Sequence, residues 1–420
     1  MTIDTRAVQA AFPALALQED GQQRGYFDAP AGTQVAGRVI AAMADVMTNH
    51  CANDGGWFRT SQATGDIVAE SLASVGQLYN CAPGDVLFGL NTTSLFFQFA
   101  PLLAAQWQPG DNILLTRMDH DANVAPWLQA AQARGAEVRF LPWDAESFAL
   151  RLDLLGDLID SRTRLVATGH ASNLLGSIND VATICAAARA VGAVSVVDAV
   201  QSVPHLLVDV QAIGCDMLCA SAYKFFGPHI AAMYLSPRLQ ALLPSLKVRP
   251  SADHMPTRFA PGTPSFEAQA GCTAAIDHLA WLGEVAGTAS ADQPLRQRLA
   301  AGLAAAQAHE QRLTAQFLDG LATIPGITLH GIGAGNRLAE RVPTFTFSTA
   351  GVSADAIAQG LAARNSFVWS GYYYAWEPAG VLGLRDGPGA VRVGLAHYHD
   401  ADDVDRLLNQ LADVIHAARG

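Results

Sequence analysis

Short apolar segments alternate with longer segments of mixed polarity through the first half of the chain. The apolar segments occupy residues 112–116, 137–141, 165–169, 194–198, 217–220 and 231–235. Each has the length and the apolar content of a strand that is buried on both faces. Ala-rich segments between them, such as 123–134 and 181–191, predict helices. This alternation predicts an α/β fold with a mostly parallel sheet covered by helices on both faces.

The pattern changes towards the C-terminus, where a long segment rich in Ala, Gln and Arg, 295–318, predicts a helix that connects two domains. Beyond it the sequence predicts strands at 344–348 and 391–395, a loop at 380–389, and an amphipathic helix at 402–418 that begins with acidic residues. We therefore expect an N-terminal arm (1–25) that packs on the small domain, a large domain (26–290) and a small α+β C-terminal domain (291–420).

Composition restricts the classes of protein to which the chain can belong. Half of the 420 residues are apolar and 15% are charged, which suits a large buried core. The net charge of −12, with no Lys/Arg-rich run, argues against nucleic acid and against an anionic membrane surface as partners. The longest nearly apolar stretch, 95–107, is too short to span a bilayer, and the N-terminus does not have the pattern of a signal peptide. The six scattered cysteines favour reduced thiols in a cytoplasmic protein, with no metal site.

A lysine and a carboxylate are the most informative chemical groups of the chain. The apolar segment 194–198 ends in Asp198, and the segment 217–220 continues into Ser221 and Lys224. Parallel strands end at one edge of a sheet, where α/β proteins bind their ligands. A lysine amine can form a Schiff base with the aldehyde of pyridoxal phosphate, while a carboxylate keeps the pyridine nitrogen protonated. This pair therefore predicts a pyridoxal-phosphate site.

Two further segments have both a functional and an ordinary structural interpretation. Asn91-Thr92-Thr93-Ser94 precedes the apolar run 95–105, where a helix start could cradle a phosphate or simply be capped. His120 follows the predicted strand 112–116. It can contact a ligand there, or it can be an ordinary loop histidine.

Eight motifs occur along the chain in an order that resembles a known family. They are Tyr26-Phe27-Asp28, Asn91-Thr92-Thr93-Ser94, Asp119-His120-Asp121-Ala122-Asn123, His170-Ala171-Ser172-Asn173, Val197-Asp198-Ala199-Val200-Gln201, Ser221-Ala222-Tyr223-Lys224, Gly262-Thr263-Pro264 and Arg392-Val393-Gly394-Leu395. From about Tyr26 to the C-terminal helix, the chain resembles the fold-type I pyridoxal-phosphate enzymes of the class V aminotransferase family, in their cysteine desulfurase-like branch. The resemblance implies a large domain with a seven-stranded, mostly parallel sheet and a smaller C-terminal domain.

The resemblance also assigns roles to individual residues. It implies that Lys224 binds the cofactor covalently, Asp198 pairs with the pyridine nitrogen, and His120 stacks on the ring and assists proton transfer. The remaining implied contacts are Thr92, Thr93 and Ser221 with the phosphate, Asn173 and Gln201 with the phenolic oxygen, Tyr223 with the cofactor, Arg392 with the substrate carboxylate, and Thr263 with the phosphate of a neighbouring subunit. The last contact implies a homodimer. Arg59 and Asn173 are further candidates for substrate binding.

One stretch departs from the family pattern. Cysteine desulfurases have Arg-Thr-Gly-His-His-Cys-Ala where this chain has Trp369-Ser370-Gly371-Tyr372-Tyr373-Tyr374-Ala375. Tyr374 stands at the position of the cysteine that accepts sulfur, and no cysteine follows residue 272. A phenol cannot accept sulfane sulfur, so we expect no persulfide relay. Tyr374 can donate a proton to a leaving group, or it can serve only in aromatic packing.

These features predict an enzyme that acts on a small L-amino acid through an external aldimine and a carbanion at Cα. Cleavage of a C–S bond by β-elimination is the leading hypothesis. Transamination, epimerisation, β-decarboxylation and aldol-type cleavage use the same parts and remain alternatives. A non-catalytic subunit that binds the cofactor is the alternative from another class.

Overall fold

A seven-stranded sheet forms the base of the large domain, with strands in the order β4-β12-β11-β10-β9-β5-β6. The computed structural model describes residues 3–387 and 389–419. The strands are β4 (Val86–Gly89), β5 (Asn112–Thr116), β6 (Glu137–Leu141), β9 (Thr163–Gly169), β10 (Val194–Asp198), β11 (Met217–Ser221) and β12 (Ala231–Leu235). β12 runs antiparallel to β11 and β4, and the other strands run parallel to one another. The prediction of a mostly parallel sheet is confirmed.

The central strands β5, β10, β11 and β12 are buried at every position, which explains why they appear in the sequence as continuous apolar runs. The prediction that segment 137–141 is a buried strand was wrong, because β6 lies at the edge of the sheet and is exposed or partly exposed along most of its length. The other edge strand, β4, was not predicted from the sequence. Its four residues are too few for a periodic pattern to distinguish them from an apolar loop.

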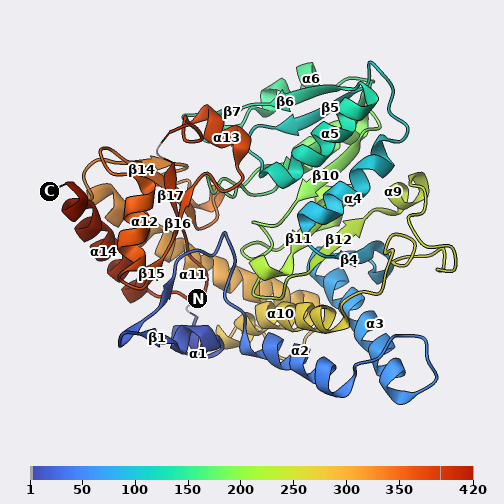
Figure 1. Ribbon diagram of the computed structural model, residues 1–420, viewed down its shortest axis with the longest axis horizontal. Coiled ribbons are helices and arrows are strands. Elements are labelled where there is room, and N and C mark those ends of the chain that lie inside the picture. Colours follow the sequence, from blue (N-terminus) through green and yellow to red (C-terminus); the bar gives the residue numbers. More distant parts are fainter. Residues whose placement is uncertain (1–2, 388, 420) are drawn as a thin grey trace.

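Helices cover both faces of this sheet (Figure 1). On one face, α4 (Thr92–Ala104) and α5 (Ala125–Arg134) share a core with alternate strand residues such as Ile113 and Leu115. On the other face, the intervening residue Leu114 packs with α7 (Val181–Ala190). The helices α2 (Gly37–Asn49), α3 (Arg59–Tyr79) and α10 (Phe266–Val285) share a core with strand residues that include Val197 and Leu218.

The small domain contains an antiparallel sheet in the order β13-β14-β17-β16. Its elements are β13 (Ile327–His330), β14 (Thr344–Thr349), α12 (Ala354–Ala362), β16 (Trp369–Gly371), α13 (Trp376–Val381), β17 (Ala390–Gly394) and α14 (Ala401–Arg419). The 29-residue helix α11 (Leu295–Thr323) packs on α10 and also on α14, so it joins the two domains as the sequence indicated (Figure 1). The predicted loop 380–389 begins within α13, and its Pro388 lies outside the described residues.

The N-terminal segment lies against both domains. α1 (Thr5–Ala10) precedes Phe12, whose ring contacts His278 of α10 and His397 beyond β17. β3 (Gly25–Tyr26) pairs in parallel with β15 (Ser366–Phe367). This placement supports an arm that packs on the small domain, while the exact domain bounds stay a prediction.

The remaining short helices and strands are β1 (Gln18–Glu19), β2 (Gln22–Gln23), β7 (Trp143–Asp144), β8 (Ala149–Leu150), α6 (Leu155–Leu158), α8 (Val210–Ile213) and α9 (Pro237–Leu242). Within the described ranges, no helix has both the length and the apolar content needed to cross a membrane.

The crossing of α10 and α11 depends on glycine. A Cβ atom at Gly302 would collide with the backbone carbonyl of Leu279, and one at Gly283 would lie 3.0 Å from the Gly302 nitrogen. We expect Gly302→Ala to lower the free energy of unfolding by about 1–3 kcal/mol, because the helices must separate to admit the methyl group. Urea denaturation measures this change.

Gly156→Ala is the matched control, since a Cβ atom at this position in α6 meets open space. It should leave stability unchanged or raise it by about 0.5 kcal/mol. Equal unfolding midpoints for the Gly302→Ala variant and the parent protein would contradict the close crossing.

Candidate active site

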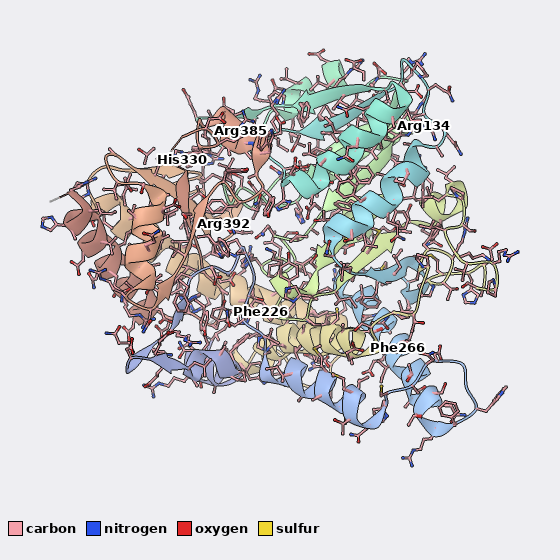
Figure 2. All side chains as sticks on the ribbon, viewed as in Figure 1. Arg134, Phe226, Phe266, His330, Arg385 and Arg392 are labelled. Atoms are coloured by element: carbon pink, nitrogen blue, oxygen red, sulfur yellow. The ribbon has the colours of Figure 1, made fainter. Side chains whose placement is uncertain are left out.

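A cavity of about 530 Å³ lies where the two domains meet, at the carboxyl ends of the parallel strands. Every predicted site residue except Thr263 and Arg59 lines it. Those that line it are Thr92, Thr93, His120, Asn173, Asp198, Gln201, Ser221, Tyr223, Lys224, Tyr374 and Arg392. Figure 2 shows Arg392, on β17, at the side of the small domain that faces the large sheet.

Lys224 stands at the end of a 3₁₀ turn, Ala222–Lys224, that directly follows β11. Its Nζ donates hydrogen bonds to the carbonyl oxygens of Pro30 (2.6 Å) and Ala31 (2.7 Å). Burial lowers the pKa of Lys224 to about 7, the positive charge of Arg392 adds to this effect, and Asp198 and Asp28 oppose it. A substantial share of the amine is therefore neutral near pH 7, the form that attacks an aldehyde.

Asp198 ends β10, and its register with Cys219 on β11 brings the two strand ends together. One carboxylate oxygen accepts the Val200 N–H at 2.9 Å. Burial raises the pKa of Asp198 to about 6, against the effects of that hydrogen bond and of the Lys224 charge. A cationic N–H donor in the cavity would stabilise the ionised form.

The first turn of α4 forms a polar cradle against the end of β11. Ser221 Oγ accepts the Thr92 N–H (3.0 Å) and lies 2.9 Å from Thr92 Oγ1. Asn91 caps the helix by accepting the Ser94 N–H at 2.8 Å. The cradle thus combines hydroxyl groups with the positive end of a 13-residue helix, and it borders the cavity at Thr92, Thr93 and Ser221. Such a helix start suits a phosphate.

His120 presents its ring to the cavity in a neutral form. The Ala122 N–H donates to His120 Nδ1 (3.0 Å), which leaves the ring proton on Nε2. Burial lowers the pKa of His120 to about 3, and the positive charges of Lys224 and Arg392 add to the shift. The ring can therefore pack and donate from Nε2, but it stays uncharged near pH 7.

Asp119 holds the His120 loop in place, a role that sequence analysis missed. Its Oδ1 accepts Thr116 Oγ1 (2.7 Å) and the Gly169 N–H (2.8 Å), and its Oδ2 accepts Asn123 Nδ2 (2.8 Å). The ends of β5 and β9 are thereby tied together behind His120. A carboxylate immediately before the histidine was the available signal, but one of its three partners, Gly169, lies on a strand distant along the chain.

Asn173 and Gln201 line the cavity through amide groups with defined partners. Asn173 Nδ2 donates to the Tyr373 carbonyl (2.9 Å), while its buried Oδ1 has no partner among the described residues. Gln201 Nε2 donates to the Pro30 carbonyl (2.9 Å), the same oxygen that binds Lys224. The predicted contact of these amides with a cofactor oxygen stays a prediction.

Tyr223 lines the cavity beside the lysine. Its ring stacks on His229, with centroids 4.7 Å apart, and its centroid lies 4.9 Å from Lys224 Nζ. The Tyr223 carbonyl accepts the Thr33 N–H at 3.1 Å. These contacts fix the segment that carries Lys224.

Arg392 is buried and points its guanidinium into the cavity from β17. Within the described part of the chain it donates one hydrogen bond, from Nη1 to the Asn173 carbonyl (3.1 Å), and it lies over the Tyr373 ring at 4.2 Å. Burial lowers the pKa of Arg392 to about 10, so it remains charged near pH 7. The other guanidinium donors can hold a carboxylate in the forked geometry that arginine favours.

The three-tyrosine segment reaches across the domain boundary. Tyr373 and Tyr374 both have left-handed backbone conformations, with φ of 57° and 56°. The Asp121 N–H of the large domain donates to the Tyr374 carbonyl at 2.8 Å, and the Tyr374 ring lies 5.7 Å from that of His120. A non-glycine residue in this conformation costs of the order of 1–3 kcal/mol, so contacts with the large domain must hold the segment in place.

Thr263 and Arg59 lie outside this cavity and are exposed. Thr263 belongs to a loop before α10, and Arg59 is the first residue of α3. A contact of either residue with an active site would require a second copy of the chain, so both assignments stay predictions. The structure adds lining residues that sequence analysis did not select. They include Pro30, Ala31, Phe97, Asp119, Trp369 and Tyr373.

The cavity fits pyridoxal phosphate by the chemistry of its side chains. The Thr92–Ser221 cradle suits the phosphate, the Lys224 amine suits the aldehyde, and the Asp198 carboxylate suits a protonated ring nitrogen. The unpartnered buried Oδ1 of Asn173 remains available for a polar group in the cavity. Among the described residues, no cluster of three or more His, Cys, Asp or Glu side chains could hold a metal ion.

All six cysteines are among the described residues, and none of them lines the cavity. Cys219 comes nearest to the phosphate cradle, since its Sγ lies 3.4 Å from Thr92 Oγ1. Its thiol is buried, and burial raises its pKa well above the usual range. No thiol of the chain is therefore placed in the cavity to accept sulfur.

Comparison with known proteins agrees with this geometry. Residues 25–305 and 284–407 match the family model described as Aminotransferase class-V. The chain is 30% identical over 419 residues to the aminotransferase-like protein FGM3 of Gibberella zeae, covering 97% of this chain and 98% of that protein. It is 31% identical over 424 residues to a cysteine desulfurase of Pectobacterium carotovorum, covering 97% of each.

Solved structures show the same fold. The cysteine desulfurase CsdA of Escherichia coli matches with a TM-score of 0.84 at 25% identity, covering 99% of this chain and 100% of that one. The apo cysteine desulfurase of Thermococcus onnurineus matches with a TM-score of 0.86 at 24% identity over 99% of both chains, a similarity that shows the fold alone. The chain therefore belongs to the aminotransferase class-V family and is a pyridoxal-phosphate-dependent enzyme.

Proposed function

We propose that this enzyme cleaves the Cβ–S bond of an L-amino acid by β-elimination, without forming a persulfide on the protein. The observation that carries the proposal is Tyr374, which lines the cavity where desulfurases carry the cysteine that accepts sulfur. The chain keeps the groups that bind cofactor and α-carboxylate, and its thiols lie outside the cavity.

The overall reaction consumes the amino acid and water, and it yields a thiol (or sulfide), a 2-keto acid and ammonia. The Cα–H and Cβ–S bonds break, the electron pair of the Cβ–S bond leaves with sulfur, and sulfur gains a proton. The enamine that leaves the enzyme is then hydrolysed by water. No oxidant or reductant is required.

Pyridoxal phosphate supplies the aldehyde that binds the amine and the ring that delocalises the electron pair released at Cα. Arg392 holds the α-carboxylate and so fixes the direction in which Cα–H points. Lys224, with a pKa lowered to about 7, is a base suited to remove the Cα proton.

A proton donor for the departing sulfur is available among the residues that line the cavity. Tyr374 has a phenolic O–H, and His120 carries its proton on Nε2. Because burial keeps His120 uncharged, we assign Tyr374 as the donor and His120 as a packing partner.

We also infer that two copies of the chain associate, since several large apolar side chains of α2 and of the segment before α3 are exposed. Trp57 is 96% exposed and Phe58 is also exposed, in the segment between α2 and α3, and Ile40 and Met47 are exposed on α2. A second copy of the chain could cover these side chains. The contacts of Thr263 and Arg59 with a neighbouring active site belong to this proposal, and a cytoplasmic location stays a prediction.

The first prediction from this proposed function concerns the covalent bond to the cofactor. Lys224 and Lys247 are the two lysines of the chain, and Lys247 donates to the Ser251 carbonyl in a loop away from the cavity. Lys224→Ala should abolish the visible absorbance of the lysine-bound cofactor, and Lys247→Ala should leave it unchanged. After borohydride reduction, peptide mapping should find the cofactor on Lys224, and a modified Lys247 would refute the assignment.

The second prediction concerns pH. Because the folded pKa of Lys224 is lowered, its amine is neutral above about pH 7 and protonated below it. The rate of covalent cofactor attachment should rise about tenfold per pH unit below 7 and level off above it. Stopped-flow absorbance from pH 5.5 to 9.5 measures this rate. A rate that still rises steeply above pH 9, as for free lysine, would show that the pKa of the Lys224 amine is not lowered.

The third prediction tests the reaction itself. With L-cysteine and its S-alkyl and S-aryl derivatives, the holoenzyme should release sulfide or thiol and pyruvate in equal amounts. Cys51 is the exposed cysteine, and Cys51→Ser should leave the rate unchanged. A persulfide detected by alkylation and peptide mass analysis, or sulfane sulfur as the product, would contradict elimination without a relay.

A further inference from the structure

We infer that the substrate side chain is uncharged and ends in an aromatic or other apolar group, so that an S-substituted cysteine is preferred over free cysteine or aspartate. This inference rests on the proposed function for the reacting bond. The independent observation is that aromatic residues line one part of the cavity, whereas polar residues line the part assigned to the cofactor.

Sheet register places an indole beside the carboxylate-binding arginine. Trp369 on β16 is the direct antiparallel partner of Arg392 on β17, and both side chains line the cavity. Directly opposed residues of antiparallel strands have neighbouring side chains on one face of the sheet. A substrate whose carboxylate is held by Arg392 therefore has the Trp369 ring next to it.

Three exposed aromatic side chains from different segments meet at this cavity. Phe97 on α4 is 42% exposed, Trp369 is 54% exposed and Tyr374 is 74% exposed, and all three line it. Single exposed apolar residues are common on any protein, but convergence on one concave site is typical of an apolar ligand. These rings form the aromatic wall.

Two interdomain hydrogen bonds hold the segment that carries Tyr374 in position. Asn173 Nδ2 donates to the Tyr373 carbonyl, and the Asp121 N–H donates to the Tyr374 carbonyl. The Tyr373 hydroxyl donates to the Trp369 carbonyl at 3.1 Å and also to the Ala390 carbonyl. The left-handed conformations of Tyr373 and Tyr374 are thus fixed from both domains, which leaves the Tyr374 ring at the cavity instead of in the core.

The charges of the cavity disfavour an anionic side chain. Its basic lining residues are His120, Lys224 and Arg392. Burial keeps His120 neutral, Lys224 is committed to the cofactor and Arg392 to the α-carboxylate. Among the lining residues of one chain, a second carboxylate would therefore meet no free cation, and Asp121 would repel it. Arg59 of a second copy would add a cation, and the succinate probe tests for that contribution. Asp121 could instead attract a cationic side chain, so a cationic probe belongs in the test.

The test measures binding without turnover. Isothermal titration calorimetry of the cofactor-loaded protein compares 3-phenylpropanoate, succinate and 4-aminobutanoate. The first two carboxylates lack the amine needed to react with the cofactor, and borohydride-reduced protein serves for the third. We expect 3-phenylpropanoate to bind about tenfold more tightly than either of the others, because its ring contacts the aromatic wall.

Trp369→Arg should reverse this preference, since it replaces an aromatic ring with a cation beside Arg392. Tyr374→Ala should weaken the binding of 3-phenylpropanoate about fivefold and leave the affinity for succinate unchanged. The matched controls are Trp376→Ala and Tyr372→Ala. Trp376 is 46% exposed and stacks against Arg385, and neither control residue lines the cavity. Both controls should bind all three probes as the parent does.

Equal or tighter binding of succinate or 4-aminobutanoate would overturn the inference, as would unchanged affinities in both Trp369→Arg and Tyr374→Ala. Failure of the proposed function has a different signature. Covalent cofactor attachment without release of thiol and pyruvate would refute the elimination, while the preference among the three probes would still report on the aromatic wall.

Discussion

The parallel pairing of β10 with β11 is the constraint on which the active site depends. It sets Asp198 opposite Cys219 and brings the ends of both strands to one edge of the sheet. Ser221 ends β11 and contacts Thr92 at the start of α4, and Lys224 follows within one turn. A shift of this register by one residue would turn Asp198 away from the cavity and a core residue into it. Burial on both sheet faces prevents that shift, since every residue of β10 and β11 is buried.

The same burial determines the acid–base properties of the site. Desolvation raises the pKa of Asp198, lowers that of Lys224 and keeps His120 neutral. The buried cavity thus favours the neutral form of the Lys224 amine, and the Asp198 carboxylate in the same cavity can pair with a cation. The two carbonyl groups that bind Lys224 come from residues 30–31, just after the segment that pairs with the small domain.

The small domain supplies what the large sheet lacks, namely a buried arginine at the cavity and two of the three residues of the aromatic wall. Arg392 and Trp369 are neighbours across β17 and β16, and the tyrosine segment follows directly. Hydrogen bonds from Asn173 and Asp121 hold that segment against the large domain. The proposed selection of the substrate therefore depends on these interdomain contacts.

By itself, the sequence determined the elements and chemistry that local patterns encode. Continuous apolar runs identified the central strands, and residues that follow a strand end, such as Asp198 and Lys224, identified the cofactor site. Trp369 and Phe97 required the tertiary structure, because the cavity that they line is built from segments distant along the chain. The hydrogen bond from Gly169 to Asp119 also joins distant segments. The short edge strand β4 and the left-handed tyrosines were likewise decided by packing, which can override the weak conformational preferences of a few residues.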